Sequence, residues 1–499
     1  MRKIVALMLA VLLLTCSLGA NAEDAAYRMA GYDTASGGHD WENHLFFRRM
    51  ETKTGIAFSF DQTTESYDAW KKHLDAILND PAAMPDVLFK AQLTPGETQR
   101  YYAEGKLIDL KPYLAEHAPN LTALFTAHPE WERAVTLPGG AIAALPGINE
   151  LQNNNAVWIN TAWLKNVRMD MPTTAEELTE VLRAFKKKDP NLNGKNDEIP
   201  MTFTSLWDLR FLGHAFGLVS NDYYIRQNDD GSVVFTADSE ENRAFIQWLR
   251  MLWEEGLIDK NGFATADTTR AITADDATIT YGVVFGPSIM SLLPSSQLEK
   301  YEVLMPMTYG GKAEYRSFLG DVVRGTFAVT SACKDPAAMV EWVDFLYSED
   351  GGRMIQAGLE GEEYTLHSDG TWSWNDDANT VATTVLTEIA IVGGADVPGY
   401  CSAEFQRMYD DEATHRAVEQ LYQLKQVSVE PYPLVYLTDA QQARIDAIWA
   451  EMAPYMELTQ VHFVTGDKPL DDANWAEFVN TLDRMGRSEF VSIWQEAAK

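Results

Sequence analysis

The most informative segment of this chain spans residues 157–201 and reads VWINTAWLKNVRMDMPTTAEELTEVLRAFKKKDPNLNGKNDEIPM. Within it, Pro172 and Thr173 lead to Glu176 with the spacing of a capping box, which predicts the start of a helix. Apolar side chains then recur with helical periodicity, at Leu178, Val181, Leu182 and Phe185. Lysines fill positions 186–188, where positive charge suits the negative end of the helix dipole. The segment therefore predicts one amphipathic helix followed by a polar loop.

Outside this segment, short apolar runs alternate with further amphipathic helices. Residues 25–31 and 86–89 are strand candidates, and helices are predicted over 66–79, from Asp335-Pro336 and from Thr438. Alternation of strands and helices predicts an α/β fold with largely parallel sheets. The loop-rich segment 137–155, with three glycines and two prolines, is the best candidate for a first crossing between lobes.

Length and charge narrow the class of protein. A chain of 499 residues exceeds the size of one hydrophobic core and predicts two or three lobes. The 40 Lys and Arg against 73 Asp and Glu give a net charge of −33, which repels phosphate backbones and anionic membranes. This composition argues against a nucleic-acid-binding function. The 14 Trp and 20 Tyr supply flat apolar rings for a binding site.

Residues 1–22 have the features of a secretory signal peptide. Arg2 and Lys3 precede an apolar run, and Ala20-Asn21-Ala22 forms a small-x-small cleavage pattern. Cleavage after Ala22 leaves 477 residues with a charge of 38 − 73 = −35. The alternative is a lipoprotein, because Leu13-Leu14-Thr15-Cys16 loosely resembles a lipobox in which Cys16 is lipidated. Both alternatives place the chain outside the cytoplasm, at the cell surface or in the periplasm.

The two remaining cysteines do not define the fold. Cys333 and Cys401 either pair in an oxidising compartment or stay as separate thiols.

Residues 189–200, DPNLNGKNDEIP, have the spacing of an EF-hand calcium loop. Oxygen-bearing side chains occupy loop positions 1, 3, 5 and 9, and Gly194 occupies position 6, where such a loop turns sharply. Position 12 is Pro200 instead of the bidentate glutamate, and Glu198 is the natural substitute. The predicted structural Ca²⁺ ligands are Asp189, Asn191, Asn193, the carbonyl of Lys195, Asp197 and Glu198. The alternative is a surface turn that binds nothing.

Catalytic motifs are missing from the sequence. There is no G-x-S-x-G, no H-E-x-x-H and no Walker or Rossmann glycine pattern. Adjacent acids such as Asp275-Asp276 do not indicate the roughly 5–9 Å carboxylate separation of a glycosidase. A secreted α/β protein of this kind is expected to be a binding protein without catalytic residues.

The segment 157–201 resembles the extracellular solute-binding proteins, family 1, of bacterial ABC carbohydrate importers. Within that family it is most similar to the oligosaccharide-binding group that includes alginate-binding and LipO-like proteins. Further stretches agree in order: MPDVLF (84–89), GKLIDLKPYL (105–114), LWEEGLID (252–259), residues 335–365 and residues 463–497. The resemblance covers nearly the whole chain after the signal peptide, and in this group the same loop positions hold calcium.

The resemblance implies a type II periplasmic-binding-protein-like fold with two α/β lobes and a ligand cleft between them. The expected N-terminal lobe comprises residues 23–150 and 306–360, and the expected C-terminal lobe comprises residues 151–305 and 361–499. The implied function is that of a monomeric oligosaccharide-binding subunit. It delivers its ligand to ABC permease subunits when the lobes close. The alternatives are a secreted lyase or glycosidase and a sugar-sensing receptor component.

A sugar cleft needs aromatic rings for stacking and polar side chains for hydroxyl groups. Ligands of open α/β sheets meet the loops at the carboxyl ends of strands. The candidate ligand-binding residues on such loops are Asp33, His39, Trp41, Trp207, Phe285, Arg316 and Tyr364. For each of them, packing in the core or plain exposure is the alternative. The acidic chain favours a neutral ligand, although Arg316 or Arg324 could reverse that preference.

Overall fold

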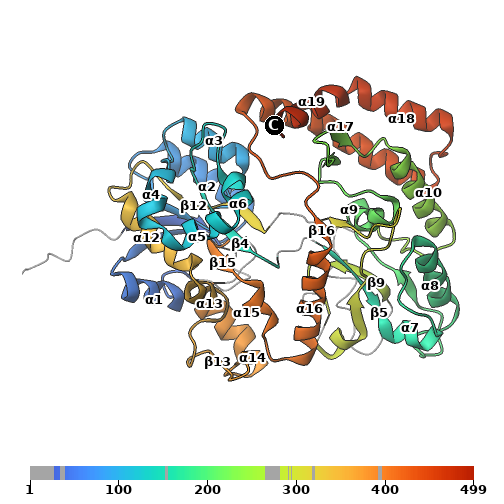
Figure 1. The fold of residues 1–499 in the computed structure, drawn as a ribbon, viewed down its shortest axis with the longest axis horizontal. Helices are drawn as coiled ribbons and strands as arrows, with labels where there is room; N and C mark the ends of the chain where they lie inside the picture. Colours follow the sequence, from blue (N-terminus) through green and yellow to red (C-terminus); the bar gives the residue numbers. More distant parts are fainter. Residues whose placement is uncertain are drawn as a thin grey trace, which may run out of the picture.

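The computed structural model describes residues 27–33, 40–151, 155–263, 281–289, 292–293, 295–316, 321–391 and 396–498. The signal segment with Cys16, and His39, lie outside the described residues. Figure 1 shows two bodies side by side, each built around its own sheet. We call the body with the six-stranded sheet the first half and the body with the four-stranded sheet the second half. Among the described residues, no helix is long and apolar enough to cross a membrane.

The first half is built on a mixed sheet with strand order β15-β4-β12-β3-β1-β2. β1 is parallel to β2 and β3, β15 is parallel to β4, and β12 is antiparallel to both of its neighbours. The strands are β1 (Tyr27–Tyr32), β2 (Phe58–Thr63), β3 (Val87–Phe89), β4 (Leu145–Asn149), β12 (Val322–Val329) and β15 (Gly399–Cys401). The helices of this half include α1 (Leu45–Thr54), α2 (Tyr67–Asn79), α3 (Pro95–Ala103), α4 (Lys111–His117), α5 (Pro119–Ala127), α6 (Pro129–Val135), α12 (Pro336–Asp344) and α13 (Glu349–Ala357).

The second half is built on a smaller mixed sheet with strand order β10-β5-β9-β6. β5 is antiparallel to β9 and β10, whereas β6 is parallel to β9. The strands are β5 (Ala156–Asn160), β6 (Ile199–Met201), β9 (Tyr281–Gly286) and β10 (Tyr301–Val303). Its helices include α7 (Thr161–Val167), α8 (Ala175–Lys187), α10 (Glu240–Glu254), α16 (Glu412–Gln426), α17 (Asp439–Thr465), α18 (Asp472–Arg484) and α19 (Arg487–Ala497).

Both sheets are more mixed than the alternation of strands and helices predicted. β12 reaches the first sheet after a crossing from the second half, not through a strand–helix–strand unit, and it inserts antiparallel between β3 and β4. The prediction of parallel strands assumed strand–helix–strand units with right-handed crossovers. That rule applies only when both strands of a unit belong to the same sheet. The prediction of largely parallel sheets was therefore wrong, although the α/β class is correct.

The predicted helix starts agree closely with the structure. α2 begins after Ser66, α12 begins after Asp335 with Pro336 in its first turn, and α17 begins at a complete capping box of Thr438 and Gln441. The predicted cap at Thr173 was off by one residue. Thr174 is the N-cap of α8, and its side chain accepts a hydrogen bond from the backbone N–H of Glu177.

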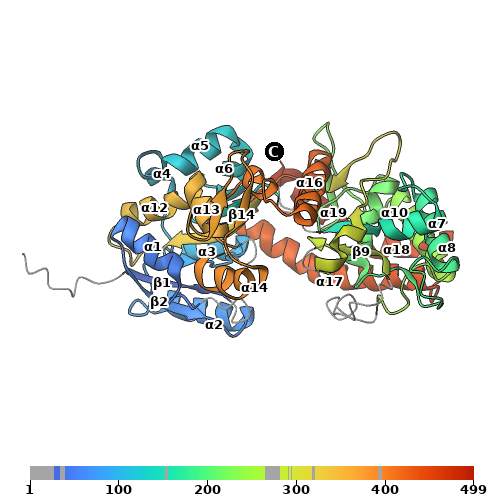
Figure 2. The ribbon, with the colours of Figure 1, turned by 90° about the horizontal axis from the view of Figure 1, so that it is seen from below.

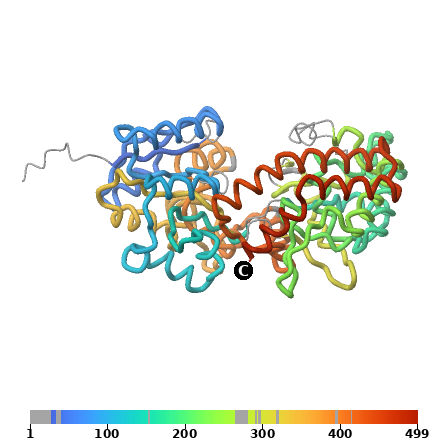
Figure 3. The backbone as a smooth tube through the Cα atoms, turned by 90° about the horizontal axis from the view of Figure 1, so that it is seen from above, coloured from blue at the N-terminus to red at the C-terminus, as the bar shows by residue number. Residues whose placement is uncertain are grey.

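The chain passes between the halves at segments outside regular structure. It leaves the first sheet after β4, returns before β12, and leaves again between β15 and α16. α17 then packs on α10, and its Gln442 approaches Gly96 of α3 in the first half. Figures 2 and 3 show this long helix running from the first half along the second.

Strand β15 differs from the division of lobes expected from the sequence. Its Tyr400 pairs with Ile148 of β4, and Gly399 lies against Ile355 and Leu346 of the first half. Residues 399–401 therefore belong to the first half, although the expected C-terminal lobe included them. A strand of three residues is too short to show a periodicity that would reveal its sheet.

Gly325 allows β12 to bend beside β3. Its φ is +73°, and an added Cβ would lie 2.2 Å from the carbonyl oxygen of Leu93. The pairing of β12 with β4 shifts register between Val323 and Phe327, on either side of this glycine. Gly105 offers a control, because its φ is +70° and an added Cβ would meet nothing within 4 Å.

We expect Gly325→Ala to lower the free energy of unfolding more than Gly105→Ala does. Both substitutions carry the backbone cost of a left-handed residue, about 1–2 kcal/mol. Only Gly325→Ala adds a steric clash, which costs about another 1–3 kcal/mol. Urea denaturation of the two variants measures the difference. Equal losses would contradict the close approach of β12 to Leu93.

Candidate functional site

Three of the predicted ligand residues are buried among apolar neighbours. Trp41 has no exposed surface and packs on Phe60 and Phe89 of the first sheet. Phe285 lies within β9 and is 3% exposed, and Tyr364 is 2% exposed in a small aromatic cluster with Trp372. A ring without exposed surface has no face on which a sugar can stack. We therefore leave these three residues out of the proposed site. They are selected only because they follow predicted strands, and their burial corrects that selection.

Asp33 belongs to a buried polar cluster at one edge of the first sheet. It follows β1, and its carboxylate lies 2.9 Å from the ammonium of Lys90, which follows the parallel strand β3. The indole N–H of Trp41 donates to the same carboxylate at 3.3 Å. Gln92 donates to Asp396 at 2.6 Å, and burial raises the pKa of Asp396 while Lys90 opposes that rise.

This cluster contains residues that the sequence analysis missed. Lys90 and Gln92 both have φ of +48°, which is unusual for residues other than glycine. They come directly after the strand DVLF, so the rule that selected Asp33 also pointed to them. Because Lys90 is 1% exposed and Asp33 4%, the cluster is buried, and it joins the loops that follow β1 and β3.

The structure brings together Trp207 and Arg316, two of the predicted residues, on one carboxylate. The indole N–H of Trp207 donates to Oδ1 of Asp222 at 3.0 Å, and a guanidinium nitrogen of Arg316 lies 2.6 Å from the same oxygen. Burial lowers the pKa of Arg316, and Asp222 opposes that shift. The Asp222 side chain keeps 42% of its surface exposed, so this network can be reached from solvent.

The backbone around Asp222 is held by a further arginine. Arg210 donates to the carbonyl of Asn221 at 2.8 Å and lies with its guanidinium 3.6 Å from the ring centroid of Tyr224. Asp222 is therefore presented on a loop that is fixed on both sides. A fixed carboxylate with two bound donors is a suitable partner for vicinal hydroxyl groups.

Tyr223 and Arg324 connect this network to the first half. The ring of Tyr223 packs on Trp449 of α17, with centroids 5.0 Å apart. Burial raises the pKa of Tyr223, the carboxylates of Asp446 and Asp222 raise it further, and the charge of Arg324 opposes them. Arg324 lies on β12, so a cation of the first sheet acts on a phenol of the second half.

None of the interactions described for Arg324 is with a carboxylate. It donates to the carbonyl of Val435 at 2.9 Å and lies 4.8 Å from the ring centroid of Tyr436. Burial lowers its pKa, and the charge partners that oppose this shift are the phenols of Tyr436 and Tyr223. Tyr223 and Tyr436 were missed from the sequence because neither follows a recognisable strand.

A cavity of about 220 Å³ lies where α6 of the first half meets the chain after α16. It is lined by residues of both halves, among them Trp131, Arg133, Asp321, Lys425 and Glu430. Burial raises the pKa of Asp321 although Lys425 contacts it, and burial likewise raises the pKa of Glu430. This cavity adds a polar space at the junction of the halves.

The predicted calcium loop turns its polar groups inward. Asp189 accepts from the backbone N–H groups of Asn193 and Gly194 at 3.1 and 3.0 Å, and the side-chain amides of Asn191 and Asn193 donate to Asp197. Asp189 and Gly194 have positive φ, +46° and +75°, which closes the loop tightly. The backbone N–H of Lys195 donates to the side-chain oxygen of Asn193, and the carbonyl of Lys195 lies on the same turn.

The surroundings of Glu198 show whether these residues suit a cation. Its Oε1 is buried without a hydrogen-bond partner. Burial raises the pKa of Glu198, and the nearby carboxylates of Asp189 and Asp197 raise it further. Acids that crowd together with an unsatisfied oxygen fit a hard divalent cation, which prefers oxygen ligands. Among the described residues, no group of three or more acidic, His or Cys side chains is arranged to hold a metal ion, and the side-chain amide of Asn193 donates to Asp197.

Cys333 and Cys401 are separate thiols in the structure, and burial raises the pKa of each, to about 11 and about 12. Neither is therefore a nucleophile at neutral pH.

Comparisons with known proteins agree with this architecture. Residues 42–353, more than half of the chain, match the model of the bacterial extracellular solute-binding protein family. The fructooligosaccharide ABC transporter substrate-binding protein FusA of Streptococcus pneumoniae serotype 4 is 27% identical over 477 residues, 92% of this chain and 87% of FusA. Lipoprotein LipO of Bacillus subtilis strain 168 is 37% identical over 120 residues, 22% of each chain.

Solved structures show the same α/β periplasmic-binding-protein fold. A FusA EF-hand mutant in complex with fructo-nystose has a TM-score of 0.75 at 24% identity, covering 95% of this chain and 98% of that one. The alginate-binding protein AlgQ2 without calcium ion has a TM-score of 0.71 at 20% identity, covering 95% and 98%. FusA therefore has an EF-hand, which was mutated in its complex with fructo-nystose. The chain belongs to the family of bacterial extracellular solute-binding proteins, and it is accordingly a binding protein and not an enzyme.

Proposed function

We propose that this protein binds an oligosaccharide outside the cytoplasm and delivers it to the permease subunits of an ABC transporter. The observation that carries the proposal is the network in which Trp207 and Arg316 share Asp222, beside Tyr223 and opposite Arg324 of the first half. The similarity to FusA, a fructooligosaccharide-binding protein, over 92% of the chain supports the same ligand class.

The proposed site supplies both kinds of contact that a sugar requires. Trp207 and Tyr223 offer aromatic rings for the C–H faces of pyranose or furanose units. Asp222 offers an exposed acceptor for adjacent hydroxyl groups, and its ion pair with the buried guanidinium of Arg316 fixes this carboxylate before ligand arrives. Arg324 would meet the ligand from the other half, so that one oligosaccharide contacts both bodies.

Delivery would follow from closure of the two halves around the ligand. They have separate hydrophobic cores and are joined by crossing segments, an arrangement suited to hinge motion. A ligand that contacts Arg324 and Asp222 together binds the closed arrangement more tightly than the open one, and it thereby shifts the population toward closure. The energy for transport would come from other subunits.

The N-terminus would determine how the protein is kept near its transporter. Cleavage after Ala22 would release a free protein of 477 residues. Lipidation of Cys16 would anchor it, as the name of the relative LipO suggests for that protein.

We further propose that the loop at residues 189–198 binds a structural Ca²⁺. The ligands would be Asp189, Asn191, Asn193, the Lys195 carbonyl, Asp197 and Glu198. The unsatisfied oxygen of Glu198 and its raised pKa support this assignment. The ion would hold α8 against β6, because the loop is the direct connection between them.

Replacement of Asp222 tests the oligosaccharide site. We expect Asp222→Asn to weaken binding of kestose at least about tenfold, since hydrogen bonds to a charged group contribute about 1.5–3 kcal/mol. Asp229→Asn, an exposed change of the same kind in the same half, should leave the affinity unaltered. Isothermal titration calorimetry measures both variants.

A panel of neutral and uronate-containing oligosaccharides should accompany kestose. If the wild-type protein gives neither heat nor thermal stabilisation with any of them, the proposed ligand class is wrong. If Asp229→Asn weakens binding as much as Asp222→Asn, the ligand class stands but the site is misplaced.

Removal of calcium tests the loop. A chelator should lower the free energy of unfolding relative to protein at a free Ca²⁺ concentration of one hundred times Kd, by about 2.7 kcal/mol. Asn193→Ala should abolish that difference, whereas Lys195→Ala should keep it, because only the Lys195 backbone would contact the ion. Thermal unfolding with and without chelator, together with elemental analysis, gives the answer. Identical unfolding curves and no bound calcium would contradict the site.

A further inference from the structure

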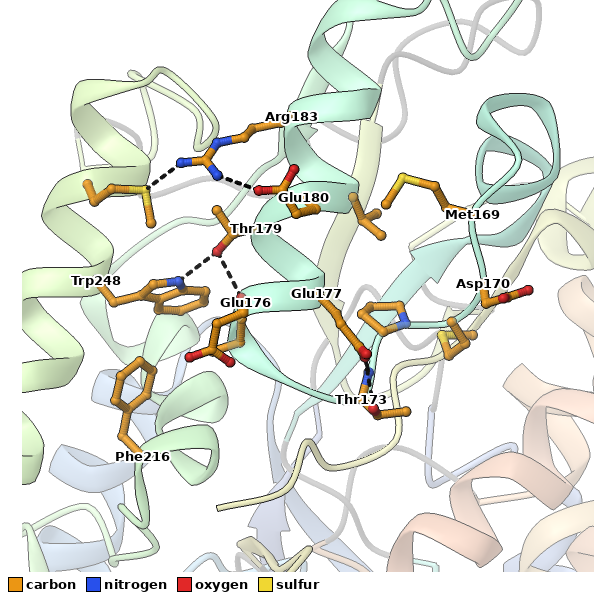
Figure 4. Close-up of a pocket in the computed structure, with 15 residues that line it drawn as sticks. Met169, Asp170, Thr173, Glu176, Glu177, Thr179, Glu180, Arg183, Phe216 and Trp248 are labelled. Carbon is orange, nitrogen blue, oxygen red and sulfur yellow. Dashed lines mark hydrogen bonds and ion pairs between the residues drawn. The ribbon is translucent and has the colours of Figure 1, made fainter. Parts of the chain in front are cut away.

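A groove lies on the second half, outside the proposed sugar site. Its volume is about 710 Å³, and it runs between the first turns of α8 and the later turns of α10. Figure 4 shows its side chains, which come from these two helices, from Phe216 and from the loop at Met169–Thr173. In Figure 1, α8 and α10 lie on the side of the second half that is turned away from the first half.

The floor of the groove is apolar and rich in methionine. Flexible thioether side chains adapt to differently shaped apolar partners, a property of surfaces that bind peptides. The floor is formed by Met169, Met171, Phe216, Trp248 and Met251. All of them except Trp248 are only partly buried, so the groove keeps apolar surface in contact with solvent.

The rim of the groove is acidic. It carries the carboxylates of Asp170, Glu176, Glu177 and Glu180, against the single cation Arg183. Arg183 is already neutralised, because it pairs with Glu180 at 2.6 Å and also with Glu255 outside the groove. The four carboxylates outweigh the positive end of the α8 dipole, which carries only about half an elementary charge. The charge of the groove therefore favours a cation.

The acids of the rim do not all have partners within the fold. Glu177 accepts hydrogen bonds from the N–H and hydroxyl of Thr173, and these bonds lower the pKa of Glu177. Asp170 and Glu176 are exposed, and among the described residues no hydrogen bond or ion pair engages their carboxylates. They remain available to basic side chains.

A carbohydrate is a poor fit to this groove. Trp248 is 9% exposed, and its indole N–H already donates to Thr179 at 2.9 Å, so neither a free ring face nor a free donor is offered. The lining residues on α8 extend from Glu176 to Arg183, about 10 Å along the helix axis. This length matches about two turns of a helix laid into the groove.

We propose that this groove binds a short amphipathic peptide segment of a partner protein, with apolar side chains on the methionine floor and Lys or Arg on the acidic rim. The site lies apart from the oligosaccharide network, so peptide and sugar can be bound together. The proposal is independent of the identity of the sugar.

The test is fluorescence anisotropy with a labelled helical peptide of 12 residues. The peptide carries Leu at positions with i, i+3, i+4, i+7 spacing and Lys beside them. A scrambled peptide of the same composition keeps the charge but has no apolar face. We expect the amphipathic peptide to bind at least about tenfold more tightly than the scrambled one, and binding to weaken as salt rises. Equal binding of the two peptides would overturn the proposal, because the overall negative charge alone would then explain it.

Two variants locate the binding. Asp170→Asn combined with Glu176→Gln should weaken binding of the amphipathic peptide at least about threefold, the effect of losing two exposed ion pairs. Met251→Gln, which leaves the charge unaltered, should weaken binding of this peptide as well. Glu241→Gln, an exposed first-turn change on α10 outside the groove, is the control and should have no effect. Unaltered affinity in the first two variants, or a loss in the control, would place the peptide elsewhere. Unaltered melting temperatures and kestose titrations confirm that the variants are folded.

Discussion

One ammonium group of the second half holds two segments of the first half where the chain crosses between them. Lys425, near the end of α16, contacts the carboxylate of Asp321 and the carbonyl of Glu150. Glu150 follows β4, and Asp321 precedes β12, so both partners lie where the chain passes between the halves. The N–H of Asn149 also donates to the carbonyl of Asp321 at 2.9 Å. A cation of the second half thus contacts two segments of the first half at the point where the chain crosses between the halves.

The crossings at this clamp bring together proposed binding residues from distant parts of the sequence. Arg324 is three residues after Asp321, and its reach toward Val435 and Tyr223 depends on where β12 begins. Asp222 and Arg316 belong to the second half, beyond the crossing. A small rotation about the clamp would alter the separation of Arg324 from Asp222 while leaving each sheet intact, since each half has its own hydrophobic core.

Local patterns in the sequence predicted local structure well. The capping residues Ser66, Asp335 and Thr438 start helices because their side chains satisfy N–H groups within the same turn. The loop at 189–198 closes as its spacing predicts, for the same local reason. The site was harder to predict, because contact depends on which loops the crossings bring together. Trp207 and Arg316 meet at Asp222, whereas Trp41 follows an equally suitable strand and is buried under Phe47 and Phe60.

Helix α8 links two features of the second half that no single motif would connect. Its first turns line the acidic groove, and its last turn leads into the loop at Asp189. Leu178, Val181, Leu182 and Phe185 are buried beneath it, so the helix is held as a rigid rod by its apolar face. The groove end of the helix is fixed by this packing and by its N-cap Thr174, and an ion bound in the loop would hold the opposite end. The proposed calcium loop and the groove therefore lie at the two ends of one packed helix.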